Sequence, residues 1–169
     1  MKELNIFEAT AFTSPNFLTL VCSEKEDGST NLAPICFVSF LSFNPPMIGF
    51  AAGKQAYTGE RVRTTKEVVI TVPGESLSEA VMSCGGATGK TTDKVKEYNI
   101  NMVELADSKI KIPADTKVVV TATLKETIDV GDHYFHICNI KHIYGNENSE
   151  SLFAWNGFGK AAPAQEKYA

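Results

Sequence analysis

The sequence predicts a mainly β protein, an antiparallel barrel with a few short helices. Six segments are rich in β-branched and large apolar residues, a composition typical of strands. The helical patterns between them are short, whereas a parallel α/β sheet needs a helix after nearly every strand. No internal repeat, heptad or low-complexity segment is present. These observations favour an antiparallel barrel over a doubly wound sheet.

The first half of the chain carries three strand patterns before its first helix. Residues 16–22 are apolar and end at a polar turn. Residues 34–43 have apolar side chains on both alternating faces, which predicts one strand buried on both sides. After the Pro45-Pro46 turn, residues 47–53 form a Gly- and Ala-rich strand. Its small side chains let other groups approach the backbone closely.

Short helices and one further strand follow. Thr58 is expected to cap a helix that runs to Arg63, because a Thr oxygen satisfies free amides of the first turn. Residues 67–72 form the next strand. Residues 76–83 and 93–98 have helical spacing, and the glycine-rich segment between them is a loop.

The two longest strand patterns lie in the second half, at residues 116–127 and 133–144. All three histidines fall within the second of these. His136 and His142 share a face there but lie about 20 Å apart at strand geometry. No metal site is therefore expected.

Length and composition predict one folded domain. The 169 residues correspond to about one domain at roughly 150 residues each, and 43% hydrophobic residues supply a core. We expect a single domain over residues 1–169, with 161–169 as a short C-terminal tail. The four cysteines show no CxxC spacing and are expected to be buried thiols.

Charge and targeting signals limit the partners. Sixteen basic against 20 acidic residues give a net charge of −4, which does not suit binding to a phosphate backbone. The uncharged stretch 28–53 is long enough to span a bilayer, but Asn44-Pro45-Pro46 would break a membrane helix. The N-terminus lacks the pattern of a signal peptide. We expect a cytoplasmic protein that binds neither nucleic acid nor membranes.

Common catalytic motifs such as GxGxxG, GxxxxGK[ST], GxSxG and HExxH are absent. Four other segments occur in order along the chain: Asp27-Gly28-x-x-Asn31-Leu32-Ala33-Pro34 with Asn44-Pro45-Pro46, then Thr58 leading to Thr65-Lys66-Glu67, then Cys84-Gly85-x-x-Thr88-Gly89 with Asp93-Lys94, and last Gly131-Asp132-His133. Together they resemble the flavin reductase-like family with the FMN-binding split barrel, and the third segment resembles its flavoredoxin-like branch. The resemblance covers about residues 14–145.

The resemblance implies an antiparallel Greek-key split β-barrel and a redox flavoprotein with FMN as its cofactor. It also implies a homodimer with FMN at the interface, and NAD(P)H or a redox protein as electron donor. An NAD(P)H-dependent oxidoreductase of the flavin reductase kind is the favoured function. Alternatives are a non-catalytic, flavoredoxin-like electron carrier, and a split barrel that holds a different ligand, such as haem.

Within this family the flavin ring needs a backbone strip with small side chains along its edge, and the phosphate needs several directed donors. Cys36 replaces a Ser that is frequent in the family, and a thiol donates a weaker hydrogen bond. The residues expected at the ring are Asn31, Leu32, Ala33, Pro34, Cys36 and Phe37 on one side and Gly49, Phe50, Ala51 and Gly53 on the other.

Lys54 and Thr58 are the expected phosphate ligands, with Arg61 and Arg63 as possible further donors. The alternative is that Thr58 only caps the helix and Lys54 is a solvated turn residue. Lys94 is expected near the pyrimidine end of the ring or the phosphate, with a surface lysine as the alternative. Trp155, with Phe153 and Phe158 in the apolar segment 152–158, is expected to cover the ring of the same or a partner subunit or to pack in the core. His133 is the candidate for assisting nicotinamide binding, against the alternative of an ordinary histidine at a strand start.

Overall fold

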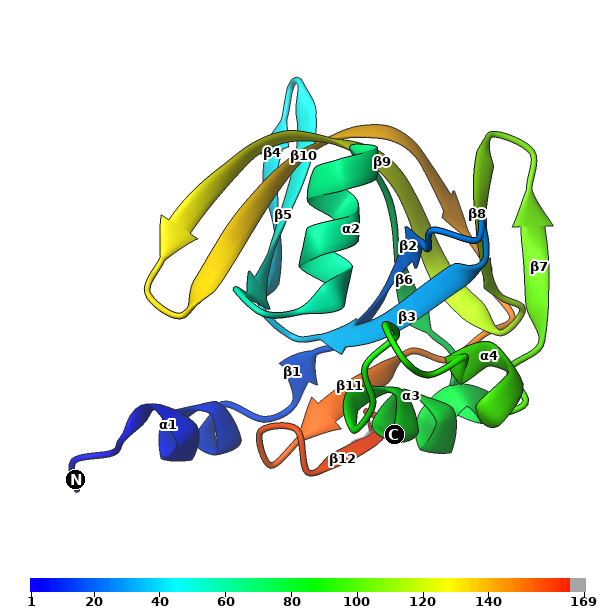
Figure 1. The fold of residues 1–169 in the computed structure, drawn as a ribbon. Helices are drawn as coiled ribbons and strands as arrows, with labels where there is room; N and C mark the ends of the chain where they lie inside the picture. The colour runs from blue at the N-terminus through cyan, green and yellow to red at the C-terminus, as the bar shows by residue number, and fades with distance from the viewer. Residues whose placement is uncertain (165–169) are drawn as a thin grey trace.

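Seven antiparallel strands form the main sheet of the structure, which is a computed structural model and describes residues 1–164. Their order is β3-β2-β6-β9-β10-β5-β4. Figure 1 shows this sheet curling around helix α2 (Tyr57–Thr65). The expected mainly β, antiparallel architecture is therefore confirmed. The strands are β2 (Thr19–Glu24), β3 (Thr30–Ile35), β4 (Val38–Phe43), β5 (Pro46–Gly53), β6 (Glu67–Pro73), β9 (Thr116–Val130) and β10 (His133–Gly145).

Two small sheets and the remaining helices pack around the main sheet. One small sheet has the order β1-β11-β12 and the other is the hairpin β7-β8. Helices α3 and α4 lie at the base of the barrel (Figure 1), where α3 contacts β3 and β12 and α4 contacts β3. The bounds are β1 (Asn16–Phe17), β7 (Met102–Leu105), β8 (Ser108–Pro113), β11 (Leu152–Trp155), β12 (Lys160–Pro163), α1 (Ile6–Phe12), the 3-10 helix η1 (Glu75–Leu77), α3 (Ser78–Gly85) and α4 (Lys94–Glu97).

Apolar side chains form two core clusters. One contains Val62 of α2 together with Phe50 and Val120 from the main sheet, so it joins α2 to the sheet. The other contains Val81 of α3 and Leu152 of β11, and it joins the sheet to the elements at the base. Because burial of each large side chain contributes about 1.5 to 3 kcal/mol, these clusters hold α2, α3 and the sheet in place.

The single strand expected at residues 34–43 is wrong. The chain leaves β3 at Ile35 and enters β4 at Val38, and these two strands form opposite edges of the main sheet. An uninterrupted apolar run gives no sign of this crossing, because both strands are uncharged. The expected burial of both faces is also wrong in β4, where Phe40 is 53% and Phe43 100% exposed.

Two further expectations need correction. The strand expected at residues 16–22 is divided, because Phe17 pairs with β11 while Thr19 begins the pairing of β2 with β3. Thr58 does not cap α2. The N-cap is Ala56, without a side-chain cap hydrogen bond, and Thr58 lies inside the first turn.

The other expected elements are present, and several were missed. The helices expected at 76–83 and 93–98 correspond to α3 with η1 and to α4, and the two long strands are β9 and β10. Helix α1, the hairpin β7-β8 and the strands β11 and β12 were not predicted. The Asn5 and Glu8 side chains form a capping box at α1, a signal that is readable in the sequence.

The first residues of the expected C-terminal tail form part of a strand. Residues 161–163 belong to β12, and residues 165–169 lie outside the described part of the chain. Within residues 1–164, the helices are all too short or too polar to cross a membrane.

Candidate functional site

A cavity of about 440 Å³ lies where β3, β5, β10 and the start of α2 meet. Its volume falls within the range of about 300 to 1,000 Å³ that is usual for small-molecule sites. Small residues at Ala33, Ala51, Gly53 and Ala56 leave the backbone accessible along its walls. Eight predicted site residues line it, namely Ala33, Pro34, Cys36, Phe37, Ala51, Gly53, Thr58 and His133.

A second cavity of about 300 Å³ adjoins the first and shares Ala33, Pro34, Ala56 and Thr58 with it. Its opposite side is formed by the glycine-rich loop after α3 and by Lys94. The two cavities therefore make one elongated site with Thr58 at the junction. We call them the apolar cavity and the polar cavity below.

The first turn of α2 faces this junction. The amides of Tyr57, Thr58 and Gly59 precede the first hydrogen bond of the helix, which Glu60 donates to the carbonyl of Ala56 at 3.2 Å. No side chain caps them. Free amides at a helix start, together with the helix dipole, favour a bound anion.

Asn31 lies behind Thr58 and is only 2% exposed. Its Nδ2 donates to the hydroxyl of Thr58 at 2.8 Å and to that of Ser23 at 3.2 Å. Its Oδ1 is buried without a partner among the described residues. A Cβ on Gly89 would lie 1.8 Å from that oxygen, so the loop passes directly over Asn31.

Lys94 carries a buried ammonium group beside the polar cavity. The residue is 4% exposed, and its Nζ donates to the carbonyls of Leu32 at 2.8 Å and Cys84 at 2.7 Å. Burial lowers its pKa from the ordinary lysine value. The ion pairs found within residues 1–164 do not include Lys94. Among residues 1–164, this positive charge therefore has carbonyl dipoles but no carboxylate to balance it.

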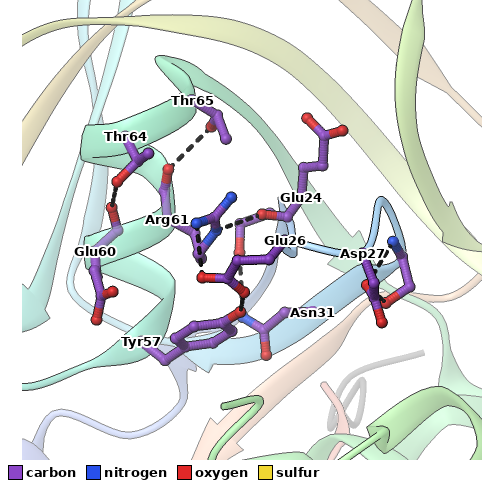
Figure 2. A network of polar contacts seen from close by, with 11 residues as sticks. Glu24, Glu26, Asp27, Asn31, Tyr57, Glu60, Arg61, Thr64 and Thr65 are labelled. Atoms are coloured by element: carbon purple, nitrogen blue, oxygen red, sulfur yellow. Dashed lines mark hydrogen bonds and ion pairs between the residues drawn. The ribbon is translucent and has the colours of Figure 1, made fainter.

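Helix α2 is fixed to the hairpin between β2 and β3 by a polar network (Figure 2). The carboxylate of Glu26 accepts hydrogen bonds from the Tyr57 hydroxyl and, at 2.8 Å, from Arg61 Nη1. Arg61 Nε also donates to the carbonyl of Glu24 at 2.8 Å. The bond from Tyr57 lowers the pKa of Glu26, and burial followed by this bond raises the pKa of Tyr57 to about 12. Arg61 is thus engaged with the hairpin.

His133 and Phe37 lie together on the wall of the apolar cavity, with ring centroids 5.7 Å apart. His133 Nδ1 is 2.7 Å from the carboxylate of Asp132, and this contact lowers the pKa of Asp132. Cys36 lines the same cavity, and burial raises the pKa of its thiol to about 11, so it is protonated at neutral pH.

Lys54 is not among the residues that line either cavity, although its neighbours Gly53 and Gln55 are. Its Nζ pairs with Asp129 at 2.8 Å and lies over the ring of Tyr134, and the bond to Asp129 raises its pKa. Arg63 packs on the same ring with its Nη1 3.3 Å from His136 Nε2. Neither residue lines the described cavities.

Four other predicted residues face away from the cavities. Leu32 and Phe50 are buried in the two core clusters. A Cβ on Gly49 would meet Phe135 at 2.4 Å. The indole of Trp155 donates to the carbonyl of Ala162 at 3.2 Å, and Trp155 is absent from the cavity walls. Leu32 still contributes to the site, because its carbonyl accepts a hydrogen bond from Lys94.

Sequence reasoning did not place several residues that line the site. Phe7 and Thr10 of α1 and Ala56 before α2 line the apolar cavity. Their positions depend on contacts between distant parts of the chain. Phe158, from the apolar segment expected near the ring, also lines this cavity, whereas Trp155 of the same segment does not.

Comparisons with known proteins agree with this geometry. The family described as "Flavin reductase like domain" matches residues 12–161. An uncharacterized protein of Archaeoglobus fulgidus is 27% identical over 105 residues, which is 61% of this chain. The chain spans about three fifths of the length of the curated relatives it matches.

Solved structures with the same fold include proteins with flavin-related names. An FMN-binding protein from Thermus thermophilus has a TM-score of 0.82 at 16% identity, covering 100% of this chain and 98% of that one. A flavoredoxin from Methanosarcina acetivorans has a TM-score of 0.81 at 20% identity, covering 100% and 94%. The NADH:FAD oxidoreductase SgcE6 of Streptomyces globisporus has a TM-score of 0.81 at 13% identity, covering 98% and 99%.

The expected split barrel is confirmed by the same kind of comparison. A protein of Shewanella frigidimarina described with a split barrel domain has a TM-score of 0.80 at 16% identity, covering 98% of this chain and 92% of that one. The family match covers most of the 169 residues. The chain therefore belongs to the family of proteins with a flavin reductase-like domain.

Proposed function

We propose that this chain is an FMN-dependent redox protein and that it acts as an NAD(P)H-dependent oxidoreductase. The observation that carries the proposal is the buried ammonium of Lys94, which has no carboxylate partner within residues 1–164 and faces a cavity next to Thr58. A buried charge is costly unless an opposite charge or several dipoles face it. An anionic ligand would supply that balance.

The residues at the site fit FMN as a ligand with a flat, mostly apolar ring and a charged end. The uncapped amides of α2 and the hydroxyl of Thr58 supply directed donors for a phosphate. Lys94 would stabilise negative charge on the phosphate or at the pyrimidine end of the ring. Because all these donors lie around the polar cavity, we assign the charged part of the cofactor there.

The apolar cavity suits the ring. Ala33, Ala51 and Gly53 leave backbone along its walls, and Phe37 and Phe158 supply aromatic surface. When bound, FMN supplies hydride and electron transfer. Cys36 is a neutral thiol there and would act by packing. His133 lies on the wall of the apolar cavity, would contact the nicotinamide donor there and is our candidate catalytic residue.

The electron donor distinguishes two forms of this proposal. Similarity to an NADH:FAD oxidoreductase supports an enzyme that reacts with a nicotinamide nucleotide. Similarity to a flavoredoxin supports the alternative, an electron carrier reduced by a protein partner. Stopped-flow mixing of the flavin-loaded protein with NADH and with NADPH separates them. Rapid bleaching of the flavin bands supports the enzyme, and no reduction by either nucleotide rejects it.

The identity of the cofactor is tested by absorption. We expect the purified protein to be yellow, with the two visible bands of a flavin, and to release FMN on denaturation in a ratio of about one per chain. Release of FAD would reject FMN as the cofactor. A Soret band would indicate haem, and a colourless protein that fails to bind added FMN would reject the flavin assignment altogether.

We also propose a homodimer in the cytoplasm. The four cysteines are free thiols, and three of them are buried, which suits a reducing compartment. The family resemblance implies the dimer, with a cofactor site at the interface.

A further inference from the structure

A buried histidine lies between helix α2 and the main sheet. His136 of β10 is fully buried, and its ring stacks on that of Phe50, with centroids 4.8 Å apart and an interplanar angle of 10°. On its other side, the Cε1 of His136 would lie 3.3 Å from a Cβ on Gly59. Gly59 belongs to the first turn of α2, so the imidazole supports the turn whose amides face the two cavities.

Arg63 lies against the same turn, although it belongs to the last turn of α2. Its Nη1 is 3.3 Å from His136 Nε2 and would lie 3.1 Å from a Cβ on Gly59. Its Cζ lies 4.7 Å from the centroid of the Tyr134 ring. The guanidinium therefore folds back along the helix and places its charge behind the first turn.

The contact between these two side chains fixes the tautomer of His136. A guanidinium can only donate, so Nε2 must accept and the proton of the neutral ring lies on Nδ1. Burial, followed by the charge of Arg63, lowers the pKa of His136, so the ring is uncharged at neutral pH. The buried Nδ1 has no hydrogen-bond partner among residues 1–164. An unpaired donor is costly, so a phenylalanine would pack here at lower cost, and what the imidazole adds is an acceptor for Arg63.

Arg63 also has no carboxylate partner in the ion pairs found within residues 1–164. Its neighbours differ in this respect. Lys54 pairs with Asp129, and Arg61 pairs with the hairpin between β2 and β3. Arg63 and Lys94 are therefore two cations near the start of α2 whose charge is not balanced by a carboxylate in this part of the chain.

These two charges act on the site from different positions. Lys94 lines the polar cavity, whereas Arg63 lies behind Gly59 and lines neither cavity. A phosphate monoester carries about 1.5 to 2 negative charges at neutral pH. A cation held behind free amides makes the potential in front of them more positive without touching the anion. Arg63 can therefore attract a phosphate through the start of the helix.

We propose that His136 is a positioning residue for the anion site: it accepts a hydrogen bond from Arg63 and fixes the guanidinium behind the first turn of α2, where its charge strengthens the binding of a phosphate. The inference rests on the proposed function for the identity of the ligand. The contact itself rests on the positions of His136, Arg63 and Gly59.

The contact is tested first in the wild-type protein without flavin. Nitrogen NMR of the imidazole should show that His136 carries its proton on Nδ1 at neutral pH. A proton on Nε2, or on both nitrogens, would overturn the proposal, because Arg63 would then have no acceptor. This measurement needs no variant and no ligand.

Fluorescence titrations with FMN and with riboflavin test the effect on the site. His136→Phe keeps a flat ring on Phe50 but removes the acceptor, so it should weaken FMN binding by about fivefold or more and leave riboflavin binding nearly unchanged. His136→Gln should restore most of the FMN affinity, because its Oε1 can accept from Arg63. His142→Phe is the matched control, since His142 lies on the same strand with its side chain 55% exposed. Equal losses for both ligands in His136→Phe, or no rescue by His136→Gln, would reject the positioning role.

A double-mutant cycle shows whether His136 acts through Arg63. Arg63→Met should weaken FMN binding at least as much as His136→Phe does. Adding His136→Phe to Arg63→Met should then cause no further loss, because the contact is already absent. Losses that add in the double variant would overturn the proposal. Thermal unfolding of each variant confirms that the titrations compare folded proteins.

Inorganic phosphate separates this inference from the proposed function. Its binding is measured by the NMR shifts of the Thr58 and Gly59 amides in the wild-type protein and in His136→Phe. Weaker phosphate binding in the variant supports the inference even if the protein does not bind FMN. Equal phosphate binding, or no binding to the wild-type protein, overturns the inference even if FMN is the cofactor.

Discussion

The Nδ2 of Asn31 donates a hydrogen bond of 2.8 Å to the hydroxyl oxygen of Thr58. Because that oxygen accepts from Asn31, the proton of the Thr58 hydroxyl is free to point toward the cavities that Thr58 lines. Asn31 is itself buried under the loop at Gly89. Asn31 thus orients a donor at the junction of the two cavities.

Thr58→Ala should weaken FMN binding more than riboflavin binding, because it removes a donor to the phosphate that riboflavin lacks. A hydrogen bond to a charged group is worth about 1.5 to 3 kcal/mol, which corresponds to roughly 10- to 150-fold in affinity. Fluorescence titration of the apoprotein measures both constants. Thr64→Ala, on the outer side of the same helix, is the control. Equal losses for the two ligands would show that Thr58 serves only the protein structure.

Lys94 should make FMN binding depend on pH. Burial lowers the pKa of Lys94, so the folded protein loses this proton at a lower pH than the unfolded chain does. Stability should rise with pH over the interval between the two pKa values, since the unfolded chain then holds more protons. FMN affinity should fall as the pH rises above the pKa that Lys94 has in the folded protein without ligand, because only the ammonium form attracts the anion.

Lys94→Met should remove this pH dependence and weaken FMN binding at least tenfold at neutral pH. Lys96→Met is the matched control, because Lys96 lies on the same short helix with its side chain 86% exposed. Titrations over a pH series provide the comparison. A Lys94→Met protein with wild-type affinity and an unchanged pH profile would contradict the role of this ammonium.

Tyr57→Phe should loosen α2 from the hairpin between β2 and β3. The Tyr57 hydroxyl is the main cause of the lowered pKa of Glu26, so removing it should raise that pKa. A carboxylate whose pKa is lower in the folded than in the unfolded protein stabilises the fold at pH values above its unfolded-state pKa. This stabilisation is lost as the pH falls through the folded-state pKa. Acid unfolding of the variant should therefore begin at a higher pH than in wild type. NMR titration of the Glu26 carboxyl group checks the shift directly, and an unchanged titration would reject the network as the cause.

Gly49→Ala should lower stability, whereas Gly53→Ala should weaken flavin binding, although both glycines lie in β5. A Cβ at Gly49 would meet Phe135 at 2.4 Å and Leu41 at 2.7 Å, so this variant should lose about 1 to 3 kcal/mol of stability through overpacking. A Cβ at Gly53 has no atom within 4 Å and would enter the apolar cavity. Gly53→Ala should keep the melting temperature and weaken flavin binding. Chemical denaturation and flavin titration of both variants provide the measurements.

His133→Ala should slow flavin reduction by NAD(P)H and leave FMN affinity nearly unchanged, because His133 would contact the donor rather than the cofactor. Stopped-flow rates of the wild-type protein come first, since the electron-carrier alternative predicts no reduction at all. His142→Ala controls for the loss of a histidine from the same strand, away from the cavity. If His133→Ala is reduced at the wild-type rate, His133 has no part in hydride transfer.

The sequence by itself determined the fold class, and it named several residues that the structure places along one cavity. Its β-branched runs, short helical patterns and Gly- and Pro-rich turns are local properties, so they predicted the long strands β9 and β10 and the helices α2 to α4 correctly. The motifs around Asn31, Thr58 and Lys94 come from distant parts of the chain, and the structure brings them within one elongated site. Their roles toward a ligand are still proposals.

Only the tertiary structure decided which partners these residues take. Lys54 and Thr58 follow the same strand and look equivalent in the sequence, but Asp129 near the end of β9 pairs with Lys54, whereas Asn31 donates a hydrogen bond to Thr58. The break between β3 and β4 was likewise invisible, because both strands are uncharged and only their pairing separates them, β3 with β2 and β4 with β5. Local periodicity indicates the type of element, whereas strand pairing and the exposure of β4 depend on residues far away in the chain.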